Sequence, residues 1–217
     1  IKGLRFDGFE DVSLVLGTGA DSLTVQGTDA AVRQTTVSTG GGGDSVALGT
    51  DLAALRSQLT VQGDAGTVVN IDVTAQTALT IARTAAGQGV LTDAAVVGRQ
   101  ILLSDIGNLN LTLGSEGDTV LVQDTAVAVD IRSGGGDDSI TLHGMRHAVH
   151  VDGGAGADLV TVFDGSATLT VADSGADGAL DTLTLQRALQ ADGSVQTQAA
   201  TNGAVHDGMA ACSARCS

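Results

Sequence analysis

Residues 153–162 read GGAGADLVTV. Glycines fill the first half, an aspartate follows, and the last residues alternate between apolar and polar, which is typical of a short β-strand. Related segments recur along the chain as LGTGADSLTV, TGGGGDSVAL, LGSEGDTVLV, SGGGDDSITL and the looser SGADGALDTLTL. Their turn aspartates, with the one quoted first, are Asp21, Asp44, Asp118, Asp138, Asp158 and Asp181.

The spacing of these aspartates predicts a solenoid. The intervals are 23 residues from Asp21 to Asp44, 20 for each of the two steps from Asp118 to Asp158, and 23 to Asp181. The 74 residues between Asp44 and Asp118 correspond to about three periods, with degenerate copies at 63–71 and 87–97. Short strands that recur at one interval can pair with their equivalents ~4.8 Å away in the next coil. We therefore expect an all-β parallel β-helix of about 8–9 coils of 20–25 residues.

Alternation also assigns each side chain to a face. The inward set is Ile140, Leu142, Val149 and Val151 in one coil and Val160, Val162, Leu169 and Val171 in the next. Ser139, Thr141, His150 and Asp152 then face outward. One segment, 50–59, carries leucines at helical spacing and is expected to form a short helix or a loop that bulges from a coil.

Composition supports this fold over others. The chain has 31 Gly, no Pro, Trp or Tyr, and only three Phe, so its apolar content is small and aliphatic. Such residues suit a thin core between close sheets, whereas a globule of this size fills its centre with aromatic side chains. A β-sandwich would not repeat one turn at one interval, and glycine with β-branched residues disfavours helices.

The charge balance restricts the partners. Ten basic residues stand against 25 acidic ones, a net charge of -15. This charge repels nucleic acids and anionic lipid surfaces and attracts cations. No apolar run is long enough to span a membrane, and the first ten residues lack a signal-peptide core, so we expect a mature form or a segment of a longer protein.

The turns suggest a cation site. Glycine allows positive φ, so turn carbonyls can converge, and the aspartate adds a carboxylate to an all-oxygen set of the kind that Ca²⁺ prefers. Calcium is therefore the cofactor we expect, with the six turn aspartates as candidate ligands. Alternatively, each aspartate hydrogen-bonds the backbone of its own turn. Carboxylates stacked ~5 Å apart repel by more than 1 kcal/mol, and Asp138 with Asp158 is the best-placed pair for a cation.

Residues 153–161 resemble the nonapeptide G-G-x-G-x-D-x-U-x of the RTX repeats at every position. The turns that end at Asp21, Asp44 and Asp138 miss only the first glycine, and Asp118 follows a turn with Glu116 in place of a glycine. The resemblance implies a secreted, calcium-dependent β-roll with the turn carbonyls and Asp21, Asp44, Asp138 and Asp158 as ligands. In that family two nonapeptides make one 18-residue coil, whereas here one such turn serves 20 to 23 residues. Residues 10–190 also resemble the repeat-rich exported surface proteins of bacteria.

Other motifs point to no catalytic centre. His143, His147 and His150 stand close enough in sequence for a transition-metal cluster, but surface histidine is the favoured interpretation because no cysteine accompanies them. A polysaccharide lyase or hydrolase would need aromatic platforms and an acid/base pair, and the chain has no Trp or Tyr and one lysine, Lys2. We expect no enzyme; a groove with Arg132 and Arg146 near Asp130 would revive that alternative.

The last residues form a separate unit in this interpretation. Residues 1–190 make the solenoid and 191–217 a C-terminal cap or tail that holds Cys212 and Cys216. The two cysteines form a disulfide within the tail or link neighbouring chains.

These features predict an extracellular or cell-surface structural protein whose solenoid assembles head-to-tail with copies of itself into a filament, sheath or surface layer. A calcium-binding spacer of a secreted adhesin or toxin is the second hypothesis, and an enzyme acting on polysaccharide is the third. A cell-surface polysaccharide is a further candidate partner.

Overall fold

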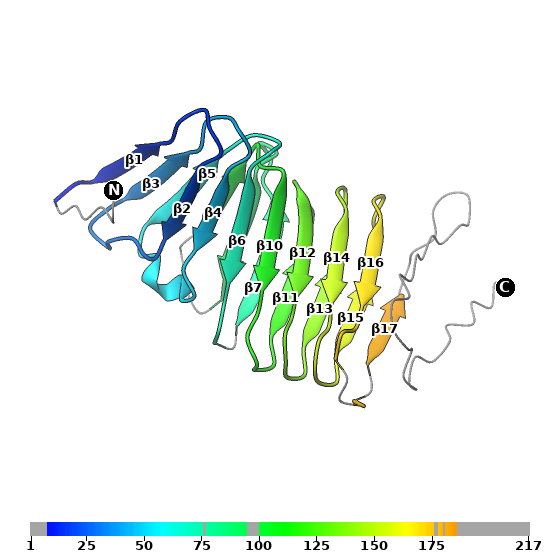
Figure 1. The fold of residues 1–217 in the computed structure, drawn as a ribbon. Coiled ribbons are helices and arrows are strands. Elements are labelled where there is room, and N and C mark those ends of the chain that lie inside the picture. The colour runs from blue at the N-terminus through cyan, green and yellow to red at the C-terminus, as the bar shows by residue number, and fades with distance from the viewer. Residues whose placement is uncertain (1–7, 76, 95–99, 176–177, 180, 186–217) are drawn as a thin grey trace.

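The computed structural model describes residues 8–75, 77–94, 100–175, 178–179 and 181–185 of the 217-residue chain, and it is an all-β solenoid of about seven turns. The predicted fold class is confirmed, with slightly fewer coils than expected. Figure 1 shows the strands stacked side by side along the molecule.

The strands form two sheets, here called sheet A and sheet B. In spatial order, sheet A holds β1 (Asp11–Val15), β3 (Gln34–Ser38), β5 (Gln58–Gln62), β9 (Ile101–Ser104), β8 (Gly89–Asp93), β7 (Ala78–Arg83), β11 (Thr119–Val122), β13 (Ser139–Leu142), β15 (Leu159–Val162) and β17 (Thr182–Leu185). Sheet B holds β2 (Ser22–Val25), β4 (Ser45–Leu48), β6 (Val68–Asp72), β10 (Asn108–Thr112), β12 (Ala128–Arg132), β14 (Val149–Asp152) and β16 (Leu169–Ala172). Outside the middle of sheet A, the chain visits the two sheets alternately.

Pairing between coils is parallel and in register. Ile140 lies beside Val160, and Val149 beside Leu169, as the repeat predicts. The predicted inward residues of β13 and β14 are at most 2% exposed, and Val160 and Val162 are at most 4% exposed. Leu169 and Val171, in the last coil of sheet B, are only partly buried. The core is therefore a narrow column of aliphatic side chains between the sheets.

The middle of sheet A departs from the repeat. Strand β9 pairs in parallel with β5 and β7 in parallel with β11, but β8 lies between them and is antiparallel to both. Sheet B passes directly from β6 to β10. Sheet A thus has three strands where the repeat would place one, which widens it by ~10 Å at this level. In Figure 1 the N-terminal strands are inclined to the C-terminal ones on the two sides of this insertion.

The insertion corrects one prediction. Residues 87–97 are not a degenerate coil: their described part contains the antiparallel strand β8. The chain reverses at 84–88, where the Thr84 N–H donates to the Gln88 carbonyl and Gly87 takes a φ of +90°. Asp44 and Asp118 are consequently separated by two and a half coils and a hairpin, not by three periods.

The segment 50–59, expected to form a short helix or a loop that bulges from a coil, contains only a short helical turn. It is a single 3-10 turn, Leu52–Ala54, capped by Asp51, whose carboxylate accepts the Ala53 N–H. Residues 58 and 59 already belong to β5. Within the described ranges, no helix is long and apolar enough to cross a membrane.

Candidate functional site in two rows of turn aspartates

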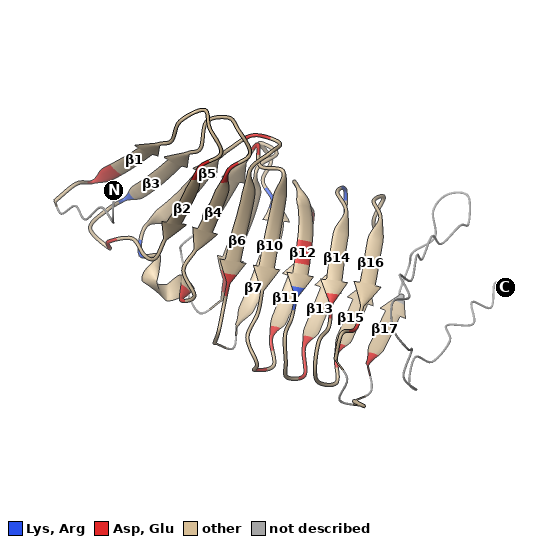
Figure 2. Ribbon diagram, in the orientation of Figure 1, with Lys and Arg blue, Asp and Glu red and all other residues tan. Residues whose placement is uncertain are grey.

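The six candidate aspartates stand in two rows at opposite corners of the solenoid. Asp21 and Asp44 directly precede strands of sheet B. Asp118, Asp138, Asp158 and Asp181 directly precede strands of sheet A. Figure 2 shows acidic residues at the starts of β11, β13, β15 and β17 along one edge of the molecule. The two rows stand at different corners because an odd number of half-coils separates β4, which follows Asp44, from β11, which follows Asp118.

Within a row, each carboxylate bonds the coil before it. The Asp118 N–H donates to Oδ1 of Asp138 at 2.7 Å, and the Asp138 N–H donates to Oδ1 of Asp158 at 2.9 Å. The series continues at both ends, where the Asp158 N–H donates to Asp181 and the Thr77 N–H to Asp118. In the other row the Asp21 N–H donates to Oδ1 of Asp44 at 2.9 Å. The aspartates thus hydrogen-bond turn backbone, as the alternative to calcium ligation expects, but in the preceding coil.

Four of the six row residues are buried, and Asp21 and Asp181, at the ends, are half-buried. Asp44, Asp118, Asp138 and Asp158 are between 1% and 3% exposed. Strand alternation explains this, because an aspartate two residues before an inward position shares its face, as Asp138 does with Ile140. That parity can be read in the sequence, since each of these aspartates stands two residues before an inward apolar position. The second oxygen, Oδ2, of each of these four carboxylates is buried and accepts no hydrogen bond of ordinary geometry from the described residues. The Ser133 hydroxyl and the Gly114 amide nevertheless lie close enough to lower the pKa of Asp138 and of Asp118, respectively, against the larger effect of burial.

Burial changes the acidity of the row. Loss of solvation raises the pKa of Asp138 to about 6, and it outweighs the hydrogen bond from the Asp118 amide. The same cause raises the pKa of Asp158 to about 6, with a further contribution from the negative charge of Asp181. Burial raises the pKa of Asp118 as well. Asp118, Asp138 and Asp158 therefore hold protons more tightly than surface carboxylates do.

Glycines let successive turns approach closely. Gly154 has a φ of +83°, and a Cβ at this position would lie 2.1 Å from the Gly134 carbonyl oxygen. Gly156 has a φ of +129° and would meet the Gly136 oxygen at the same distance. Coils in contact here exchange backbone hydrogen bonds, with the Ala155 N–H donating to Gly134 at 2.8 Å. Only glycine fits these positions in the observed backbone.

The row offers one free oxygen per coil to a proton or to a hard cation. Within the described part of the chain, no three His, Cys, Asp or Glu side chains are arranged to hold a metal. A calcium ion would therefore take one carboxylate oxygen per coil and complete its shell with turn carbonyls or water. The unpartnered Oδ2 atoms fit such a ligand, and the raised pKa values fit a proton. The geometry thus fits both a calcium ligand and a protonated carboxyl.

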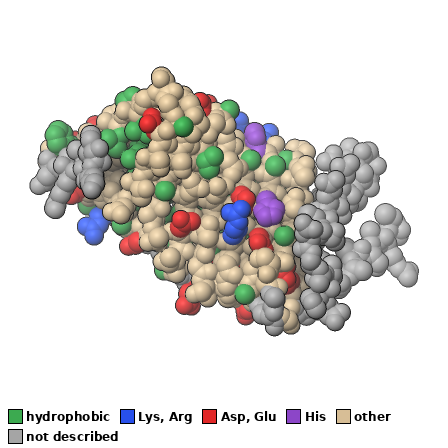
Figure 3. All heavy atoms as spheres, in the orientation of Figure 1, with side chains coloured by type: hydrophobic (Ala, Val, Ile, Leu, Met, Phe, Trp, Pro, Cys, Tyr) green, Lys and Arg blue, Asp and Glu red, His purple; other side chains and the backbone are tan. Residues whose placement is uncertain are grey.

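The histidines lie apart from these rows. His143 stacks on Phe163 with ring centroids 4.1 Å apart, and Nδ1 of His150 lies 3.5 Å from Oδ1 of Asp130. Arg132 also bonds Asp130, at 2.9 Å, on the outer face of sheet B. Arg146 instead bonds Asp124, at 3.1 Å. Charged side chains gather in the middle of the face that Figure 3 shows. Of the two arginines that the enzymatic hypothesis would place near Asp130, Arg132 bonds it and Arg146 bonds Asp124 instead.

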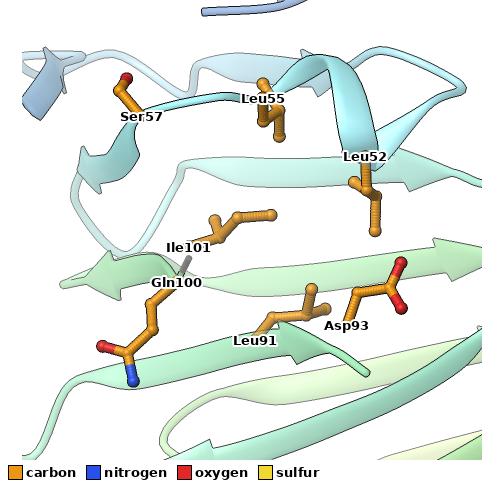
Figure 4. Close-up of a pocket in the computed structure, with 7 residues that line it drawn as sticks. All are labelled: Leu52, Leu55, Ser57, Leu91, Asp93, Gln100 and Ile101. Carbon is orange, nitrogen blue, oxygen red and sulfur yellow. The ribbon is translucent and has the colours of Figure 1, made fainter. Parts of the chain in front are cut away.

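A hollow lies beside the inserted hairpin. It is lined by Leu52, Leu55, Ser57, Leu91, Asp93, Gln100 and Ile101. Leu52 and Leu55 come from the 3-10 segment and face Leu91 and Ile101 from β8 and β9 (Figure 4). Its walls are mostly aliphatic, and it lies where the widened sheet A meets the loop after β4.

The remaining candidates, Cys212 and Cys216, lie outside the described residues, as do the proposed tail 191–217 and its boundary. No protein-family model matches the chain, and no curated protein or solved structure matches it significantly. The sequence and the geometry are therefore the basis for the function proposed below.

Proposed function

We propose that this chain is a non-enzymatic extracellular structural protein whose solenoid stacks head-to-tail with copies of itself. The observation that carries the proposal is the incomplete burial of apolar side chains in the two end coils. Apolar inward residues are fully buried along the middle of the column but only partly buried at its ends: Leu14 and Leu23 at one end and Leu169, Val171 and Leu183 at the other. Another coil stacked on either end would bury them.

The end strands support the same proposal. Among the described strands, none pairs with the outer edge of β1 or β2, and none with the outer edge of β16 or β17. Unpaired edges of this kind template pairing with another chain. Contact between two different end faces generates an open filament when the rotation does not close a ring.

A second candidate function rests on the aspartate rows. Four buried Oδ2 atoms without hydrogen-bond partners would accept Ca²⁺ as the solenoid folds, which suits a calcium-dependent spacer in a secreted adhesin or toxin. In that case the chain is a monomeric rod that carries an active domain elsewhere.

Electron microscopy and size-exclusion chromatography of the purified chain test both proposals. The chain should be studied with and without EDTA and with and without reductant. Filaments that persist in EDTA support the structural proposal. A monomer whose midpoint of thermal unfolding rises with calcium, but not with equal ionic strength of NaCl, supports the spacer. A monomer insensitive to calcium contradicts both.

A further inference from the structure

Whether the number of alternating strands is odd or even decides which strand of one copy would lie over which strand of the next. The first strand, β1, and the last described strand, β17, both belong to sheet A. With the β7–β8–β9 insertion counted as one step, the chain makes fifteen alternating passes from β1 to β17. The described strands therefore end half a coil out of phase with their start. A strand that continued the solenoid after β17 would lie over β16, at the edge of sheet B.

The aspartate rows lead to the same offset independently. Asp181 stands before a strand of sheet A, whereas Asp21 stands before β2 of sheet B. A row can continue from one copy to the next only if Asp21 of the second copy lies at the corner occupied by Asp181. This requires a half-turn about the solenoid axis, which places β1 over β16 and β2 over β17.

Local sequence fits this half-turn. Residues 181–185 read DTLTL and residues 21–25 read DSLTV, so polar and apolar positions match one to one. The spacing fits as well: nine residues separate Val12 from Asp21, as nine separate Val149 from Asp158 in the coils at the other end. The β1–turn–β2 unit thus has the geometry of the β14–turn–β15 unit, which already stacks in the C-terminal row.

The end faces are also complementary in hydrogen bonding. Along each row the aspartate N–H donates to Oδ1 of the aspartate in the following coil. Asp181 is the last described member and its N–H has no acceptor among the described residues. Asp21 uses Oδ2 to accept the Gly17 N–H at 2.9 Å, and its Oδ1 has no donor in the described part of the chain. One end offers a donor where the other offers an acceptor.

We infer that copies of this chain stack head-to-tail with a half-turn at each joint, β17 of one copy pairing in parallel with β2 of the next and the Asp181 N–H donating to the Asp21 carboxylate. The inference rests on the proposed self-assembly and adds its geometry. At the joint, Thr184 lies beside Thr24 of the next copy, Leu183 beside Leu23, and β16 beside β1. Sheets A and B then alternate along each side of the filament.

Disulfide trapping tests the joint. In a chain with Cys212→Ser and Cys216→Ser, we would introduce Thr184→Cys with Thr24→Cys, which face outward on strands that the half-turn makes neighbours. The control pair is Thr184→Cys with Ser13→Cys, which would be neighbours if copies stacked without rotation, β17 over β1. Neighbouring parallel strands place Cα atoms within disulfide reach. Mild oxidation and non-reducing electrophoresis then report covalent ladders.

The expected result is a ladder from the Thr24 pair and none from the Ser13 pair. Filaments that cross-link only through the Ser13 pair, or through neither pair, overturn the half-turn and leave the structural proposal standing. Absence of assembly in every variant, including the parent, rejects the structural proposal and the inference together. Because each substitution lies on an outer face, circular dichroism and the unfolding midpoint should match the parent.

A charge-matched comparison adds a second readout. Asp21→Asn leaves one carbonyl oxygen for two donors, so the concentration needed for assembly should rise by roughly tenfold, the value of one hydrogen bond to a charged group. The control Asp72→Asn removes the same charge from an exposed position on β6. Equal assembly by the Asp21→Asn variant and the parent would contradict the bond at the joint.

Discussion

The coils of residues 108–172 and the segment between β6 and β10 solve the same packing problem in different ways. In the first region each coil has a glycine turn, an aspartate and a fixed length of 20 residues. In the second, 35 residues separate the two strands and the chain makes a three-stranded meander. Inward residues such as Leu79, Ile81, Leu91 and Leu103 are nevertheless buried. Alternation alone is therefore enough to build the core, whereas the glycine–aspartate turn sets the coil length and the strand direction.

The largest effect should come from breaking the turn in the regular region. Gly154→Ala forces a Cβ to 2.1 Å from the Gly134 carbonyl oxygen at a φ of +83°. Steric overlap together with backbone strain should lower the free energy of unfolding by at least about 4 kcal/mol, measured by urea denaturation. Gly19→Ala is the matched control, because its Cβ would meet no atom within 4 Å and its φ is not positive. It should change stability by less than about 0.5 kcal/mol.

The two regions should also differ in how their cores respond to truncation. Leu109→Ala on β10 removes a side chain with no exposed surface and should cost about 3–4 kcal/mol. Leu91 on β8 is almost as buried as Leu109, but it lines the hollow beside the hairpin. Leu91→Ala therefore removes fewer contacts than Leu109→Ala does. We expect a cost of about 2 kcal/mol from equilibrium unfolding. Equal costs would show that the insertion packs as tightly as the regular coils.

How far sequence alone predicts this molecule differs between the same two regions. Where the turn repeats, alternation and spacing predicted the strands, the inward faces and the register of Ile140 with Val160, because stacking leaves one arrangement that buries every apolar residue. In the middle, GQGVLTD alternates equally well in either direction. Its reversal depends on the turn at 84–88, with Gly87 at positive φ, and that turn has no aspartate to mark it.

The candidate site was predicted in composition but not in geometry. All six aspartates stand in stacked rows, as their spacing suggested. The corner on which a row stands could not be read from the turns, because the same glycine–aspartate sequence fits both corners. The corner depends on the number of half-coils in the middle of the chain. That number is correct only when β7, β8 and β9 are counted as one insertion, which the sequence does not reveal.

Protonation should affect the regular region most, because Asp118, Asp138 and Asp158 are buried there. A carboxyl whose pKa is raised on folding binds more protons in the folded chain than in the unfolded one between pH ~4 and pH ~6. Stability is then greatest below that window and is lost as pH rises through about 6. We expect a loss of about 1 kcal/mol from pH 4.5 to 7.5 in chelator, below the full linkage value because solvent at the turn screens the charge.

Asp138→Asn sharpens this test. The amide oxygen can still accept the Asp118 N–H, but position 138 no longer carries a titrating group. The pH dependence of the urea midpoint should therefore become shallower, while the free energy of unfolding at pH 7.5 stays the same or rises. Asp72→Asn, exposed on β6, removes the same charge and should leave the slope unchanged. An unaltered slope in the Asp138→Asn variant would mean that the row does not carry the pH dependence.

The smallest effect should come from the outer face at the boundary of the two regions. On sheet B, Nδ2 of Asn110 donates to Oδ1 of Asn70 at 2.8 Å, and Asn70 in turn donates to Ser45 at 3.1 Å. This amide ladder links β4, β6 and β10, so it crosses the point where sheet A is widened. Asn110→Ala removes one partly solvated side-chain bond and should cost about 0.5 kcal/mol. If hydrogen exchange of the β6 and β10 amides quickens well beyond that cost, the ladder holds sheet B together against the splay of sheet A. If exchange changes only in proportion to global stability, backbone pairing between β6 and β10 alone holds the two halves of the solenoid together.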